Sequence, residues 1–191
     1  MIKGKKHRKE RGTSLIEMIV SIAIIGIIYS IYFLNYRNIE KDLALERSAY
    51  KTAQYFRVAL EKTLAAEKPE GEENLPQGYG IYIKRQGYGP NATYTVSLYV
   101  DKKNTEEYYD SNDDILDNLS LEPGVKVNDI IVSPPFQDEL SINFKIPLPH
   151  IKISARVGVS THEKDNITII LTNSSKTKKI HVNKSGLIYV E

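Results

Sequence analysis

Residues 12–34 read GTSLIEMIVSIAIIGIIYSIYFL, and this stretch decides how the rest of the chain is organised. No charged residue occurs from Met18 to Leu34. Together with residues 13–17, the stretch reaches 22 residues, close to the roughly 20 that a helix needs to cross a bilayer. It therefore predicts a membrane-spanning helix. Glu17 needs a partner from outside this helix, because no Lys or Arg lies in residues 13–36.

The segment before this stretch is strongly basic. Residues 1–12 contain six Lys or Arg and one Glu, whereas the rest of the chain has 20 basic and 23 acidic residues. The positive-inside rule then predicts a cytoplasmic N-terminus and an exported chain from residue 36 onward. The pI of 8.5 reflects the basic tip and gives no support for a nucleic-acid-binding body.

Other interpretations of the apolar stretch stay open. Its length and its basic flank argue against a buried core helix. A cleaved secretory signal peptide needs small residues near the cut, but the stretch ends in the bulky residues 29–34. A plain signal anchor fits the hydropathy and leaves Glu17 unexplained.

The run from Gly12 to Gly26 resembles the N-terminal signature of type IV pilins and pseudopilins. In that family, a membrane prepilin peptidase cuts after the Gly that ends a short basic leader and methylates the new amino terminus. The resemblance implies a cut between Gly12 and Thr13, N-methylation of Thr13, and an assembly role for Glu17. Two positions depart from the pattern: the first mature residue, usually Phe or Met, is Thr13, and a Pro common late in the stretch is replaced by Leu34.

The helix is expected to continue beyond the membrane. Residues 35–68 contain no Gly or Pro, and the breaker Lys68-Pro-Glu-Gly71 follows. One helix over 13–67 would be roughly 80 Å long, too long to pack entirely on one small domain. The apolar residues expected to face that domain are Ile39, Leu43, Tyr50, Ala53, Phe56, Leu60 and Leu64.

The rest of the chain reads as β structure. The predicted strands are 78–85, 93–100, 125–132, 140–145, 151–159, 166–172, 178–183 and 187–190, separated by Gly, Pro and Asn turn signals. The last three form a predicted meander. The fold class is α+β, with a C-terminal antiparallel sheet domain packed on the second half of the helix. We divide the chain into a leader (1–12), a transmembrane and assembly helix (13–35), an amphipathic exported half-helix (36–68) and a β-rich domain (69–191).

Three further patterns bear on possible binding or modification sites. Asp110, Asn112 and Asp114 have the spacing that starts a calcium loop, but the Gly and Glu that complete one are missing. The basic group Lys176, Lys178, Lys179 and Lys184 could contact DNA or simply be a solvated strand edge. Five Asn-x-Ser/Thr sequons, Asn173 and Asn183 among them, are interpreted as chance. With no Cys and no catalytic motif, the sequence predicts no enzyme and no cofactor.

These observations predict a structural subunit, minor in abundance, of a type IV pilus or of a type II secretion or competence pseudopilus. The order of elements is similar to GspH/FimT-type minor pseudopilins. The implied partners are prepilin peptidase, other pilin subunits, an inner-membrane assembly platform and lipid before assembly. The expected location is the inner membrane in single-pass topology, then the filament. Two alternatives stay open: a filament-tip subunit that contacts DNA or a surface, and an anchored domain that never polymerises.

Overall fold

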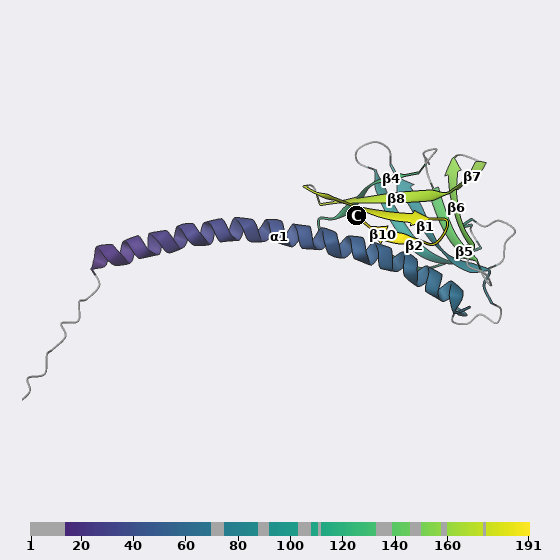
Figure 1. Ribbon diagram of the computed structural model, residues 1–191, viewed down its shortest axis with the longest axis horizontal. Helices are drawn as coiled ribbons and strands as arrows, with labels where there is room; N and C mark the ends of the chain where they lie inside the picture. The colour runs from purple at the N-terminus through teal and green to yellow at the C-terminus, as the bar shows by residue number, and fades with distance from the viewer. Residues whose placement is uncertain are drawn as a thin grey trace, which may run out of the picture. The chain divides into compact units, whose positions relative to one another are not determined.

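The computed structural model describes residues 14–69, 75–87, 92–102, 108–110, 112–132, 139–145, 150–157, 160–173 and 175–191. The chain divides into two compact units, Met1–Glu40 and Lys41–Glu191, and one helix contributes to both. That helix, α1, runs without interruption over Leu15–Leu64 (Figure 1). The predicted continuous helix is thus confirmed over the described residues.

The helix ends just before the predicted breaker. Ala66 takes a left-handed backbone conformation with φ of 46°, which an α-helix does not continue. The Tyr79 hydroxyl then donates a 2.7 Å hydrogen bond to the carbonyl oxygen of Glu67. The chain leaving α1 is therefore tied to the first strand.

The described residues after α1 form two antiparallel sheets. The strands are β1 (Gly78–Gln86), β2 (Thr93–Asp101), β3 (Asp114–Asn118), β4 (Lys126–Ile131), β5 (Glu139–Lys145), β6 (His150–Val157), β7 (Ser160–Lys164), β8 (Asn166–Thr172), β9 (Thr177–Asn183) and β10 (Ile188–Val190). One sheet has the order β3-β2-β1-β5-β6-β7 and the other β10-β9-β8-β4 (Figure 1). The α+β class and the terminal meander β8-β9-β10 are confirmed. The sequence did not predict β3, β7 or the division into two sheets.

Alternate residues of both sheets point into one core with the second half of α1. The strand residues include Ile81, Ile142 and Ile169, each fully buried. On α1 the buried face consists mostly of small residues: Leu45, Ser48, Ala49, Thr52, Ala53, Phe56, Ala59 and Thr63. The predicted apolar face was therefore largely wrong, because Leu43, Tyr50 and Leu64 are exposed and of the seven expected residues only Ala53 and Phe56 are fully buried.

Two glycines of β1 let side chains cross this central strand from one neighbour to the other. Gly80 lies opposite Tyr99 of β2, and a Cβ on Gly80 would sit 2.4 Å from the Tyr99 ring. The Tyr99 hydroxyl shares a 2.7 Å hydrogen bond with Ser141 of β5. Gly78 lies between Asp101 of β2 and Lys145 of β5, and a Cβ there would meet the Phe144 carbonyl oxygen and Asn143 Oδ1 of β5. The side chains of β2 thus brace β5 across β1.

A tyrosine cluster covers this braced face. The ring of Tyr109 stacks on Tyr82 with centroids 4.2 Å apart and meets the edge of Tyr99 at 5.3 Å. The Tyr108 hydroxyl donates to Glu139, and Arg156 lies over the Tyr108 ring. Strand β1 is consequently buried on both faces from Gly78 to Ile83.

Candidate processing and assembly site

The carboxylate predicted to act in assembly lies in the first turn of α1. Glu17 is the third residue of the helix, where a negative charge interacts favourably with the helix dipole. Its carbonyl oxygen accepts a 2.8 Å hydrogen bond from the Ser21 hydroxyl. The side chain itself is exposed. Gly12 and Thr13, the predicted cleavage and methylation residues, and the leader 1–12 lie outside the described residues.

The first half of α1, around Glu17, is an apolar rod (residues 15–33) that no other part of the described chain covers. Large hydrophobic side chains from Leu15 to Phe33 are each at least half exposed. Among the described residues, α1 is the one helix long and apolar enough to span a membrane, and none of its apolar window is buried. Apolar surface of this extent is not stable in water. This segment therefore requires lipid or other protein around it.

Gly26 lies in the middle of this apolar segment, and no contact within the chain requires a glycine at this position. A Cβ at Gly26 would meet no atom within 4 Å, and glycine in a helix interior costs about 1 kcal/mol relative to Ala. One turn later, the Ser30 hydroxyl donates back to the Gly26 carbonyl at 2.8 Å, so its polar group is satisfied within the helix. Small residues one turn apart on a membrane helix allow another helix to approach closely.

Comparison with known proteins identifies the N-terminal stretch. Residues 7–29 match the prokaryotic N-terminal methylation motif, so the chain carries the type IV pilin and pseudopilin signature. This motif implies processing by prepilin peptidase and assembly with other pilin subunits. It marks a structural family, not an enzyme family. No curated protein and no solved structure matches the chain.

The calcium candidate is not assembled as a metal site in the described part of the chain. Asp110 accepts hydrogen bonds from the backbone and side-chain nitrogens of Asn112, at 2.6 and 3.4 Å. Asp114 begins β3 and instead forms an ion pair with Lys102. No group of three or more potential ligands occurs among the described residues. The spacing reflects a local turn that leads into an edge strand.

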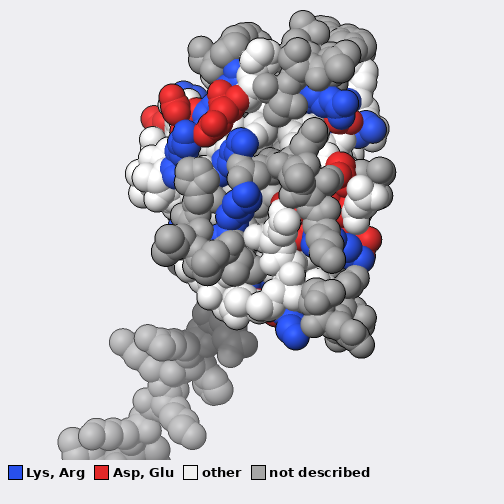
Figure 2. Space-filling model, turned by 90° about the vertical axis from the view of Figure 1, so that its right-hand side faces the viewer, with Lys and Arg blue, Asp and Glu red and all other residues white. Residues whose placement is uncertain are grey.

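The basic group near the C-terminus is half neutralised. Lys176 forms an ion pair with Asp42, and Lys184 forms one with Glu163. Those contacts raise the pKa of Lys184 and lower the pKa of Asp42. On the face shown in Figure 2, described acidic and basic side chains occur together. The described residues thus provide little support for a DNA-binding surface.

A buried carboxyl that the sequence did not single out lies at the glycine-braced face. Asp101 is 1 % exposed, and its Oδ2 accepts a 2.7 Å hydrogen bond from the side-chain amide of Asn143. Asp101 Oδ1 and Asn143 Oδ1 are both buried without a hydrogen-bond partner. Burial raises the pKa of Asp101 to about 6, and the nearby Asp113 carboxylate adds to the shift. Its signal in the sequence was a charged residue at the end of an apolar strand.

Two of the sequons turn out to be hairpin turns. In the β8–β9 turn, Asn173 Oδ1 accepts from the nitrogen and hydroxyl of Ser175. In the β9–β10 turn, Asn183 Oδ1 accepts from the nitrogen and hydroxyl of Ser185 in the same way. The Asn-x-Ser pattern at these positions is therefore turn chemistry.

Proposed function

We propose that the chain is a structural subunit of a type IV pilus or pseudopilus, made as a prepilin and assembled through the first half of α1. The methylation motif at residues 7–29, on a helix whose apolar surface is uncovered, carries this proposal. We place the cut between Gly12 and Thr13, with Thr13 as the methylated terminus. The exported unit then begins where α1 leaves the membrane.

Glu17 would act by pairing with a neighbouring copy. Cleavage creates a cationic amine at Thr13, four residues before Glu17, or about 6 Å along the helix axis. In a filament, apolar segments pack side by side, and an unpaired carboxylate among them is costly. A pair between Glu17 and the Thr13 amine of an adjacent subunit offsets much of that cost. It also sets the register of the incoming subunit.

Two measurements test this proposal. Mass spectrometry of the protein from its native membrane should find a methylated Thr13 terminus; an intact Met1, or a terminus beyond residue 30, contradicts it. Glu17→Ala should leave leader removal intact, because Gly12 is untouched, and reduce recovery in sheared filaments. Glu40→Ala, which removes an exposed Glu further along α1, is the matched control. Equal incorporation of Glu17→Ala and the control contradicts the role of Glu17.

We further propose a minor subunit, on the basis of the resemblance to GspH/FimT-type pseudopilins. Quantitative mass spectrometry of purified filaments should then find this chain well below the major subunit. Stoichiometric amounts would make it a major subunit instead. The proteins that co-purify with it identify the machine that it serves. Retention on DNA at low salt that is lost at high salt would favour the tip-binding alternative.

A further inference from the structure

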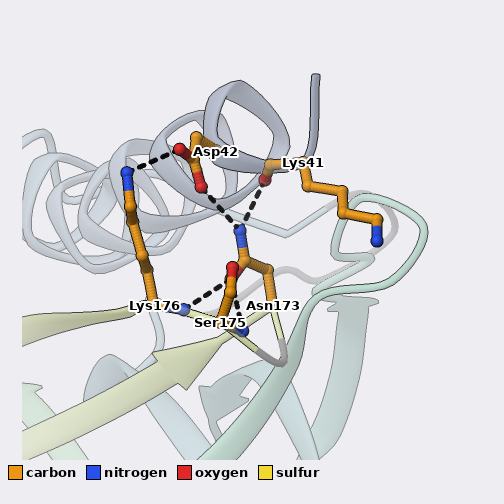
Figure 3. Close-up of polar contacts among 5 residues, drawn as sticks. All are labelled: Lys41, Asp42, Asn173, Ser175 and Lys176. Atoms are coloured by element: carbon orange, nitrogen blue, oxygen red, sulfur yellow. Dashed lines mark hydrogen bonds and ion pairs between the residues drawn. The ribbon is translucent and has the colours of Figure 1, made fainter. Parts of the chain in front are cut away.

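The β8–β9 turn holds α1 at the first residues of the Lys41–Glu191 unit. The side-chain nitrogen of Asn173 donates to the carbonyl oxygen of Lys41 at 2.9 Å and to Asp42 Oδ1 at 3.3 Å (Figure 3). Lys176 Nζ donates to Asp42 Oδ2 at 2.6 Å. Asn173 is 3 % exposed. We call these four residues the helix clamp.

The turn needs only half of the Asn173 side chain. Its Oδ1 accepts from Ser175 N, Ser175 Oγ and Lys176 N at 2.9–3.2 Å, which closes the turn. The β9–β10 turn achieves the same closure with Asn183 Oδ1 and hydrogen bonds to Ser185 and Leu187. The side-chain nitrogen of Asn173 is therefore not needed to close the turn, and it donates to α1 instead.

The clamp lies at the last attachment of α1 before its uncovered half. Among the described side chains of α1, Leu45 is the first that is buried, and all those before Lys41 are exposed. In an α-helix the carbonyl of Lys41 also accepts from the amide of Leu45. Asn173 thus contacts the oxygen that begins the first hydrogen-bonded turn of the domain's own helix.

We propose that the helix clamp keeps α1 helical and attached to the β8–β9 turn from Lys41 onward. Bending or unwinding of the helix before Lys41 would then not extend into the core. Without the clamp, α1 would first be held by the buried side chain of Leu45 and then by a hydrogen bond at Ser48, whose hydroxyl accepts from the backbone of Glu122 at 3.1 Å. The inference rests on contacts inside the Lys41–Glu191 unit. It holds whether or not the chain assembles into a filament.

Hydrogen exchange of the full chain in detergent micelles tests the proposal. Asn173→Asp keeps the oxygen that closes the turn but removes the donor to Lys41 and places a second carboxylate beside Asp42. Losing this hydrogen bond and adding that repulsion should speed exchange of the amides of residues 45–49 about tenfold. Lys176→Met, which removes an exposed ion pair, should speed them about two- to fivefold.

The controls separate the clamp from general stability. Asn183→Asp makes the same chemical change in the same kind of turn and should leave residues 45–49 unchanged. In every variant, the amides of residues 53–59 should stay protected. Asp42→Lys keeps the Asn173 hydrogen bond to the Lys41 carbonyl and replaces the ion pair with a repulsion, so it should speed exchange at least as much as Lys176→Met. Adding Lys176→Asp should restore slow exchange. Unchanged exchange at 45–49 in Asn173→Asp overturns the proposal, and so does acceleration that extends equally over 53–59.

Discussion

Replacing Asp101 by Asn should stabilise the domain at neutral pH. The carboxylate of Asp101 is buried, and both Asp101 Oδ1 and Asn143 Oδ1 lack a donor. An amide at position 101 can donate to Asn143 Oδ1 while its own oxygen still accepts from the Asn143 amide. The substitution therefore removes a buried charge and supplies the missing donor.

The size and sign of the effect follow from the pKa. Folding raises the pKa of Asp101 to about 6, from about 3.9 in an unfolded chain. The folded state binds the proton more tightly, so Asp101 reduces stability as pH rises from about 4 to about 6, and the loss is complete above that range. A shift of this size corresponds to about 2 to 3 kcal/mol at pH 7.

The assay is urea unfolding of wild type and Asp101→Asn at several pH values between 4 and 7.5. The difference in unfolding free energy between the two proteins reports Asp101 and its interaction with Asp113, because the other carboxylates titrate in both. We expect the pH-dependent part of this difference to grow from near zero at pH 4 to about 2 kcal/mol at pH 7. A constant difference would show that folding does not shift the pKa of Asp101, and a less stable variant at pH 7 would show that the folded state favours the charge. Either result would refute the reasoning.

Two other perturbations follow from the fold. Gly80→Ala should destabilise the domain by about 2 to 3 kcal/mol in the same assay, because its Cβ would lie 2.4–2.6 Å from the buried Tyr99 ring and hydroxyl. Gly26→Ala, whose Cβ meets nothing within 4 Å, should leave unfolding of the domain unchanged, and equal effects at the two positions would contradict the bracing of β1. A fragment of residues 35–191 should be folded and monomeric by light scattering, because the apolar rod is absent; persistent aggregates would count against this boundary.

The helix and most strands could be predicted because they carry strong local signals. An apolar stretch of membrane length, the absence of Gly and Pro up to Lys68, and the alternation in β9 each act within a few residues. The face of α1 that packs on the domain was not predictable in this way. The sheets bury Ala49, Ala53 and Ala59, because small side chains let a helix approach closely, whereas a hydrophobicity pattern gives most weight to large residues.

The two strands that sequence analysis missed are the two edges of the six-stranded sheet. All five residues of β3 are exposed, and both it and β7 contain charged residues. An edge strand is held by backbone pairing on one side and needs no apolar alternation, so its sequence resembles a loop. The helix clamp could not be predicted from local sequence patterns either, because it joins residues more than 130 positions apart.

The tyrosine cluster makes the folding of the sheet domain measurable by ultraviolet spectroscopy. The chain has 13 tyrosines and no tryptophan, so its ultraviolet emission comes from tyrosine alone. The stacked rings of Tyr82 and Tyr109 and the edge contact with Tyr99 exist only while the braced face is intact. Tyr29, Tyr32 and Tyr36 are exposed on α1 and lie outside this cluster. Near-ultraviolet circular dichroism should therefore follow the loss of the sheet face, while the far-ultraviolet signal of the long helix follows α1 separately.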